Sequence, residues 1–264
     1  MSSYLTGMNV LVTGASDGIG AAIAQQLAKQ GVESLILAGR DRSRLEKTAR
    51  SVEVPCQLHV ADLSVQTGVD QLLDDLADEK IDGLVNNAGV GLGGRFESLP
   101  IEDQNRMVFL NCQAVIQLSH ALLGPMQERQ RGFILFVGSL IGFVGGPGMA
   151  AYSGTKGFVN RFAESLRWEL SEDSVRVILL APGVTRTSFF ETAGISEDHI
   201  RAGQMTAKDV AKEAVQGVTR NSATVVAGGR NRGLLFLMRF APRRLVGAVS
   251  RRIFSGILQQ KSTK

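Results

Sequence analysis

Short, uninterrupted apolar runs alternate with segments of helical pattern along most of the chain, and this alternation constrains the fold most. The runs are rich in Val, Ile and Leu, as is typical of parallel strands that are buried on both faces. Seven strands are expected, over residues 9–13, 34–38, 57–61, 83–86, 133–137, 176–180 and 224–227. The pattern therefore predicts an α/β fold with a doubly wound parallel sheet of about seven strands and helices on both faces.

Helices are expected to start at 18–20, to span roughly 102–129 and 151–170, and to start again at Thr206, where Thr-x-x-Asp resembles a capping box. With 264 residues, 44% of them hydrophobic, the chain can form one sizeable core and is short for two independent domains. We expect one α/β domain over 1–229 and a basic, apolar extension over 230–264.

A glycine-rich loop, Thr-Gly-Ala-Ser-Asp-Gly-Ile-Gly over residues 13–20, joins the first predicted strand to the first helix. Gly14 permits a tight turn, Gly18 lets the backbone approach a pyrophosphate, and Gly20 lets helix and strand pack closely. The helix N-terminus offers N–H groups and partial positive charge to phosphates. Such a loop alone is often only a turn, but the flanking strand and helix favour a dinucleotide site.

The second predicted strand ends in Ala-Gly-Arg, so Gly39 stands where a carboxylate usually binds a free ribose 2′-hydroxyl. The guanidinium of Arg40 can bind a 2′-phosphate through two hydrogen bonds, which favours NADP(H) over NAD(H). The alternative is that Arg40 is a solvated arginine, with Asp17 and Asp41 diluting the positive field around it.

Two further strand ends carry polar residues. Asp62 is expected either to accept a hydrogen bond from the adenine amino group or only to cap a helix. The small residues of Asn87-Ala88-Gly89 let the chain pass under a flat ring system, although alone this motif can be an ordinary turn.

Ser139 follows the fifth predicted strand, and Tyr152 and Lys156 lie four residues apart in a helical pattern, on one face of the helix. A tyrosine with a pKa of about 10 is a poor acid or base at neutral pH, and a nearby ammonium lowers that pKa. Asn111 lies among apolar neighbours, where its amide needs partners. Aromatic–lysine pairs are common on surfaces, so a catalytic site is predicted from the four residues together.

In order and spacing, these motifs resemble the short-chain dehydrogenase/reductase family, in its single-domain branch with a Rossmann-type fold. Residues 13–20 match the family's Thr-Gly-x-x-x-Gly-x-Gly, and residues 86–89 match its Asn-Asn-Ala-Gly. Ser139, Tyr152 and Lys156 match its Ser and Tyr-x-x-x-Lys, and the resemblance covers roughly residues 8–228.

The resemblance implies a role for each site residue. Tyr152 would exchange a proton with the reacting oxygen, and Ser139 would hydrogen-bond that oxygen. Lys156 would hold the nicotinamide ribose and lower the pKa of Tyr152, and Asn111 would hold a water that relays protons. The residues expected to bind the cofactor are Gly14, Ser16, Asp17, Gly18, Ile19, Gly20, Arg40, Asp62, Leu63, Asn87, Ala88, Gly89, Tyr152, Lys156, Pro182, Gly183, Thr185 and Thr187. Family members associate through two long central helices, so a homodimer or homotetramer is expected.

The net charge of +4 hides an uneven distribution. From Asn221 onward there are nine Arg or Lys residues and no Asp or Glu, which leaves 20 basic and 25 acidic side chains in the first 220 residues. The basic residues alternate with Leu, Ile, Val and Phe, so the segment is apolar as well as basic, which argues against nucleic-acid binding. No secretion signal, run of 18 apolar residues or metal-like spacing of Cys56 and Cys112 is evident. A cytoplasmic protein without a metal is expected.

Two segments bear on the substrate. The loop over 140–149 is apolar and glycine-rich, which favours an apolar substrate, and residues 188–205 are expected to form a mobile lid.

In the extension, five apolar residues share one helical face, namely Leu245, Val246, Val249, Ile253 and Ile257. This face is expected to pack on the protein, to cover the substrate site, or to make peripheral contact with a membrane.

The sequence therefore predicts an NADP(H)-dependent oxidoreductase that transfers hydride to or from the carbonyl or alcohol carbon of a lipophilic small molecule. The alternative is a non-catalytic NADP-binding sensor or interaction protein on the same fold. The same residues would serve reduction and oxidation.

Overall fold

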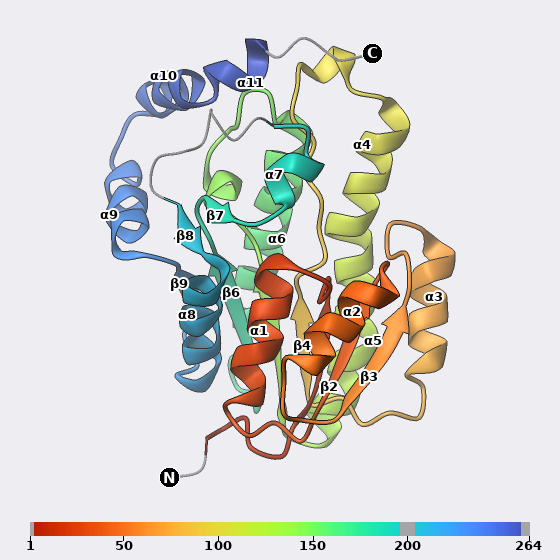
Figure 1. The fold of residues 1–264 in the computed structure, drawn as a ribbon. Helices are drawn as coiled ribbons and strands as arrows, with labels where there is room; N and C mark the ends of the chain where they lie inside the picture. Colours follow the sequence, from red (N-terminus) through yellow and green to blue (C-terminus); the bar gives the residue numbers. More distant parts are fainter. Residues whose placement is uncertain (1–2, 196–203, 260–264) are drawn as a thin grey trace.

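A computed structural model describes residues 3–195 and 204–259 of the chain (Figure 1). Seven parallel strands form the central sheet in the order β3-β2-β1-β4-β5-β6-β9. They are β1 (Asn9–Thr13), β2 (Ser34–Gly39), β3 (Cys56–Val60), β4 (Gly83–Asn86), β5 (Gly132–Val137), β6 (Val175–Ala181) and β9 (Thr224–Val226). The doubly wound parallel sheet is confirmed, and each strand agrees with its predicted range to within one residue at either end.

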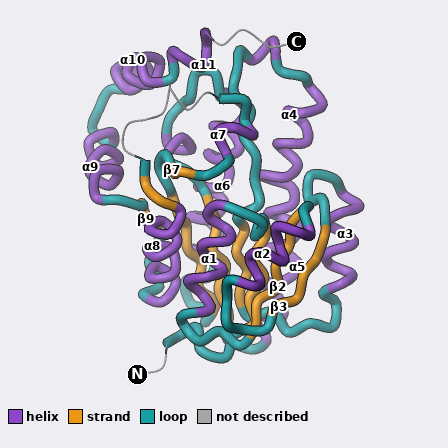
Figure 2. Tube along the Cα trace, viewed as in Figure 1, coloured by secondary structure: helices purple, strands orange, loops and turns teal. Residues whose placement is uncertain are grey.

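Helices cover both faces of the sheet (Figure 2). The first face carries α1 (Gly18–Ala28), α2 (Arg42–Arg50) and α8 (Ala207–Thr219), and the second carries α3 (Gln66–Asp75), α5 (Ala114–Glu128) and α6 (Ala150–Glu169). The three middle residues of β1 show why a strand that is buried on both faces is apolar. Val10 and Val12 belong to the core under α1 and α8, whereas Leu11 belongs to the opposite core, and all three are fully buried.

One helical stretch runs from Ile101 to Glu128 through α4 (Ile101–Val108), a π-helical turn (Phe109–Gln113) and α5. Its extent matches the predicted helix over 102–129, but the π-turn was not predicted. By length and hydropathy alone this stretch could cross a membrane, but such evidence is weak, because core helices of soluble proteins pass the same test. Here 44% of its apolar window is buried inside the protein, where α5 packs against β4 and β5.

Helix α8 begins as predicted, because the Thr206 hydroxyl accepts a hydrogen bond from the Asp209 amide at 3.1 Å. A second, two-stranded parallel sheet was not predicted and pairs β7 (Thr185–Arg186) with β8 (Met205–Thr206). The segment expected to form a lid contains a short helix, α7 (Phe189–Thr192). The rest of that prediction, over residues 196–203, lies outside the described residues.

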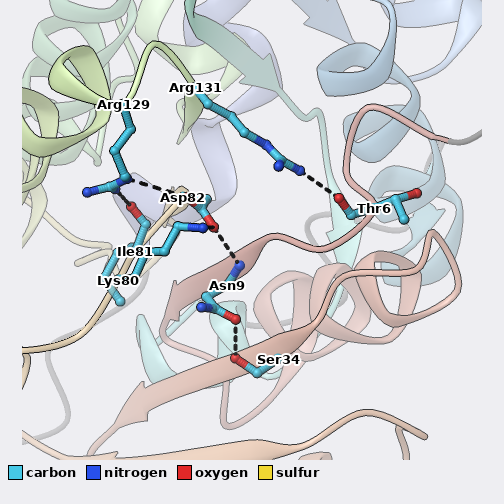
Figure 3. Close-up of polar contacts among 8 residues, drawn as sticks. All are labelled: Thr6, Asn9, Ser34, Lys80, Ile81, Asp82, Arg129 and Arg131. Carbon is cyan, nitrogen blue, oxygen red and sulfur yellow. Dashed lines mark hydrogen bonds and ion pairs between the residues drawn. The ribbon is translucent and has the colours of Figure 1, made fainter.

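At the opposite end of the sheet, Asp82 joins the starts of two strands to the end of α5 (Figure 3). Its fully buried carboxylate accepts a hydrogen bond from the Asn9 amide at 3.2 Å. The same carboxylate lies 3.6 Å from both Arg129 Nε and Lys80 Nζ. These charges compensate the burial of Asp82 and fix this end of the sheet, far from the strand ends where ligands are expected.

The extension forms three short helices, α9 (Gly229–Met238), α10 (Arg243–Ile253) and α11 (Ser255–Gln259). Pro242 lies between the first two, where its fixed φ and missing N–H prevent one continuous helix. The three helices lie beside the carboxyl ends of the strands, at the same end of the molecule as α7 (Figure 1).

Candidate active site

A single cavity of about 840 Å³ runs along the carboxyl ends of the strands, from the glycine-rich loop to the extension. Most of the site residues predicted from the sequence line it, namely Gly14, Ser16, Asp17, Gly18, Ile19, Arg40, Asp62, Leu63, Asn87, Ala88, Gly89, Ser139, Tyr152, Lys156, Pro182, Gly183, Thr185 and Thr187. The other two, Gly20 and Asn111, lie behind this lining. The doubly wound sheet thus brings residues that follow six of its strands, together with Tyr152 and Lys156 of α6, to one cavity.

The glycines of residues 13–20 fit a phosphate-binding loop. Gly14 and Gly18 have positive φ angles of 63° and 59°, a conformation that strains other residues. A Cβ on Gly20 would lie 2.3 Å from the Gly14 carbonyl oxygen, so only glycine allows α1 to approach the loop this closely. The N-terminus of α1 consequently lies at the cavity wall, where its N–H groups can hold phosphates.

Thr13 and Asn87 tie the glycine-rich loop to the turn after β4. The buried Thr13 hydroxyl accepts hydrogen bonds from the amides of Asn87 and Ala88 at 3.1 and 3.0 Å. The side-chain amide of Asn87 donates to the carbonyl oxygens of Thr13 and Gly14 at 2.9 and 3.1 Å. Because the Asn87 side chain is occupied in this way, it positions the cofactor loop. The sequence placed Thr13 in the glycine-rich motif but did not predict that its hydroxyl joins the two loops.

At the end of β2, Arg40 is exposed at the cavity edge and forms no ion pair with a described residue. Both nearby carboxylates are engaged elsewhere. Asp41 caps α2 by accepting from the Arg44 amide at 3.0 Å and pairs with the Arg44 guanidinium at 3.4 Å. Asp17 accepts hydrogen bonds from Ser188 Oγ at 2.7 Å and from the Gly18 amide at 2.7 Å. These two bonds lower the pKa of Asp17 despite its partial burial.

At the end of β3, Asp62 already has protein partners. Its carboxylate accepts hydrogen bonds from the Ser64 amide and hydroxyl and pairs with Arg106 at 2.7 Å. Burial raises the pKa of Asp62, but the Ser64 hydrogen bonds and the charges of Arg106 and Arg40 outweigh that effect and lower it. Sequence reasoning missed Arg106, which lies 44 residues further along the chain on α4. The adenine role of Asp62 stays a prediction.

Tyr152 and Lys156 lie one turn apart on α6, and both are buried. Burial raises the pKa of Tyr152 well above its usual range, although a hydrogen bond from Ser139 acts in the opposite direction. Burial also lowers the pKa of Lys156 to about 8. The Lys156 ammonium lies 6.0 Å from the centre of the Tyr152 ring and donates to the Val137 carbonyl oxygen at 2.8 Å. Desolvation by burial is the largest influence on the Tyr152 pKa. The lowering of that pKa by Lys156, which the resemblance implies, stays a prediction.

Asn111 lies in the π-helical turn, a deformation often found at functional sites. Its side-chain amide donates to the Val90 carbonyl oxygen at 2.9 Å and to Thr155 Oγ1 at 3.0 Å, and its oxygen accepts from the Val90 amide at 3.0 Å. The amide thus has the partners that its burial requires, and it joins the loop after β4 to α6. The water relay implied by the resemblance stays a prediction.

Asn160 is a positioning residue that sequence reasoning missed. Its side chain donates to the Ser139 carbonyl oxygen at 3.0 Å and accepts from the Ser139 amide at 3.3 Å. The signal was its spacing, because Tyr152, Lys156 and Asn160 repeat every four residues and share one face of α6.

We expect Asn160→Leu to lower turnover about tenfold, because Ser139 loses the two bonds that orient it toward the reacting oxygen. Steady-state kinetics and NADPH titration would separate kcat from cofactor affinity, and the affinity should stay within about twofold. Asn160→Asp keeps the bond to the Ser139 amide and should recover part of the turnover. Asn105→Leu, an exposed asparagine on α4, is the matched control. An equal loss of kcat and NADPH affinity would contradict the positioning role.

The extension supplies one wall of the cavity, which the sequence offered as one of three outcomes. Four of its five aligned apolar residues line the cavity, namely Leu245, Val246, Val249 and Ile253, and the fifth, Ile257, is buried nearby. The Ser250 hydroxyl donates to the Gly145 carbonyl oxygen, joining α10 to the loop after Ser139. On the other side Phe189 packs on the Tyr152 ring, with 5.3 Å between ring centres.

The fold and the site together define an α/β nucleotide-binding protein with a buried tyrosine and lysine in its cavity. The model of the short chain dehydrogenase family matches residues 8–198. The chain belongs to this family of oxidoreductases, which act on alcohol and carbonyl groups.

Three known proteins illustrate the similarity. An NADP-dependent 3-hydroxy acid dehydrogenase of Schizosaccharomyces pombe is 32% identical over 240 residues, which covers 85% of this chain and 92% of that protein. The 3-ketodihydrosphingosine reductase of Bos taurus is 33% identical and covers 81% of this chain and 70% of its own length. A short-chain dehydrogenase from Sphingobium yanoikuyae, solved in complex with NADPH, superposes with a TM-score of 0.80, covering 97% of this chain and 99% of its own, at 29% identity.

Proposed function

We propose that this protein is an NADP(H)-dependent reductase or alcohol dehydrogenase for lipophilic carbonyl compounds and the corresponding alcohols. One observation carries the proposal. A single cavity joins the glycine-rich loop, the Ser139–Tyr152–Lys156 group and the apolar wall of α9 and α10. Cofactor, acid–base group and apolar substrate can therefore lie side by side. An intact buried group of this kind favours an enzyme over the non-catalytic sensor.

The chemistry of the proposed reaction follows from the side chains. A bound nicotinamide supplies or accepts the hydride. Burial keeps the Tyr152 phenol protonated at neutral pH, so it can donate a proton to a carbonyl oxygen during reduction. Ser139, which Asn160 holds in place, hydrogen-bonds the same oxygen. Lys156 offers a buried cation to the nicotinamide ribose. In the reverse reaction the phenolate form of Tyr152 receives the hydroxyl proton.

The preference for NADP(H) depends on the end of β2. Arg40 stands free there, and the ion pair with Arg44 offsets the charge of Asp41 beside a 2′-phosphate. Arg44 and Ser16 line the same part of the cavity. A Cβ on Gly39 would lie 2.3 Å from Ser16 Oγ, so glycine lets this hydroxyl approach the end of β2. The S. pombe and S. yanoikuyae relatives, described as NADP-dependent and NADPH-bound, agree with this choice.

The substrate class depends on the other end of the cavity. Beyond Tyr152 the wall is formed by apolar residues of the loop after Ser139, of α7 and of the extension, including Ile141, Phe190, Leu234, Met238 and Val249. Desolvation of an apolar substrate in such a site is favourable, and of the extension's residues that line the cavity only Arg230 is charged. The bovine relative is named as the reductase of a sphingoid ketone, which agrees with an apolar substrate.

Titration calorimetry with NADPH and NADH tests the cofactor assignment. Arg40→Ala should weaken NADPH binding by about 1.5–3 kcal/mol, the range for a hydrogen bond to a charged group. NADH binding should change little because NADH has no 2′-phosphate. Arg42→Ala is the matched control, since Arg42 is exposed outside the cavity. Equal losses for both cofactors would refute the role of Arg40.

A substrate panel tests the reaction itself. Nicotinamide absorbance is followed with both cofactors, and the panel includes long-chain aldehydes, cyclic ketones and their carboxylated analogues. We expect turnover of the uncharged compounds with NADPH. If NADPH binds but no carbonyl or alcohol compound turns over, the sensor alternative replaces the enzyme.

A further inference from the structure

The surface of the extension is unusual for its apolar exposure. Of the thirteen large apolar side chains that are exposed among the described residues, seven lie within 234–253. Phe236 and Phe240 are 61% and 75% exposed and pack edge to face, with 5.4 Å between ring centres. Neither lines the cavity. Clustered exposed aromatics of this kind usually mark an interaction site.

The charge of the same surface identifies a partner. The described part of the extension contains seven arginines and no acidic residue. Arg232 pairs with Glu213 of α8, and the other six make no ion pair with a described residue. Arg239, Arg243 and Arg244 lie within five residues of Phe240 and are exposed. Exposed aromatics among uncompensated arginines match a negatively charged lipid surface, which takes up the rings and attracts the guanidinium groups.

We propose that α9 and α10 form a docking surface for anionic membranes, with Phe236 and Phe240 as apolar anchors and Arg239, Arg243 and Arg244 as headgroup contacts. A second copy of the chain fits this surface less well. A symmetric dimer would bring two acid-free basic surfaces together, and like charges disfavour such a contact.

The docking surface is continuous with the cavity. Leu237, Leu245 and Ile253 are 67%, 56% and 60% exposed, and each also lines the cavity. The cavity therefore has an apolar rim at the side that would face the lipid. A lipophilic substrate could pass from the bilayer to Tyr152 between α9 and α10 without crossing water. This delivery step depends on the function proposed above, whereas docking itself does not.

Co-sedimentation with lipid vesicles tests docking without any need for activity. The full chain is mixed with phosphatidylcholine vesicles, with or without about 30% phosphatidylserine. We expect binding to the anionic vesicles that weakens as salt rises from about 50 to 500 mM. Phe236→Ser/Phe240→Ser should weaken this binding at least about tenfold, because two rings lose apolar burial. If the unaltered chain stays in solution with anionic vesicles at low salt, the proposal is overturned.

A charge-matched pair of variants separates position from net charge. Arg239→Gln/Arg243→Gln/Arg244→Gln should weaken binding by about fivefold per arginine, or about a hundredfold in all. Arg42→Gln/Arg50→Gln/Arg161→Gln removes the same charge from exposed sites elsewhere and should weaken binding far less. Equal losses in the two triple variants would contradict a defined docking surface. All variants should keep the thermal stability of the unaltered protein and its activity on a water-soluble ketone.

Two further measurements separate the other uses of this surface. If sedimentation velocity shows that Phe236→Ser/Phe240→Ser breaks an oligomer while vesicles never bind, the surface joins two copies and docking is refuted. Docking with no turnover of any carbonyl compound would instead refute the proposed function and leave docking intact.

The delivery of substrate from the bilayer is tested by activity. Phe236→Ser/Phe240→Ser should lose activity on a bilayer-dissolved ketone while retaining it on the soluble one. Equal retention on both would refute the delivery step.

Discussion

Replacing Tyr152 with phenylalanine is expected to lower turnover by at least about a hundredfold, the lower end of the range for general acid–base catalysis. Phenylalanine keeps the ring and its contact with Phe189, so only the hydroxyl that exchanges the proton is lost. NADP(H) affinity should change little, because a ring of the same shape remains at this position. Single-turnover measurements of nicotinamide absorbance would isolate the chemical step from product release.

The other tyrosine of the chain, Tyr4, offers a matched control. Tyr4 donates a hydrogen bond to the Gly132 carbonyl oxygen at 2.8 Å, and Gly132 begins β5 at the opposite end of the sheet. Tyr4→Phe removes the same hydroxyl and should leave turnover within about twofold, since it touches no group of the site. Near-normal chemistry in Tyr152→Phe would show that another group transfers the proton.

Replacing Lys156 with methionine is expected to stabilise the protein while impairing it as an enzyme. The buried ammonium has its pKa lowered from 10.5 to about 8, which corresponds to an upper limit of about 3 kcal/mol of desolvation cost below pH 8. Loss of the hydrogen bond to Val137 offsets part of this gain. We expect the free energy of unfolding at pH 7 to rise by about 1–3 kcal/mol. Turnover should fall about 10- to 150-fold if Lys156 binds the cofactor.

The pH dependence of this stabilisation has a definite sign. Below pH 8 Lys156 is charged in both the folded and the unfolded chain, so its full desolvation cost is present. Between pH 8 and 10.5 the folded protein holds fewer protons than the unfolded chain, and the cost fades. The advantage of Lys156→Met should therefore be greatest below pH 8 and disappear by about pH 10.5.

Denaturant unfolding of the cofactor-free protein at several pH values measures this advantage. The control is Lys29→Met, an exposed lysine, which should change stability by less than about 0.5 kcal/mol. A Lys156→Met variant that is less stable at pH 7 would mean that the Lys156–Val137 hydrogen bond outweighs the desolvation of the ammonium.

The sequence determined the sheet, because a parallel strand buried on both faces requires a continuous apolar run of a certain length. Val10, Leu11 and Val12 face opposite cores in turn, so no polar residue could stand among them. It also placed the glycine loop, since the positive φ angles of Gly14 and Gly18 depend on residue type. The spacing of Tyr152 and Lys156 fixed their common helix face in the same way.

Only the tertiary structure decided which partners these residues meet. Ser250 contacts Gly145 across 105 positions of sequence, and Arg106 reaches Asp62 across 44. The sign of the Tyr152 pKa shift likewise depended on how deeply the fold buries the ring, which the spacing to Lys156 does not contain. Sequence periodicity reflects local backbone geometry and burial, whereas contacts between distant segments, and the desolvation that they cause, are set by the path of the whole chain.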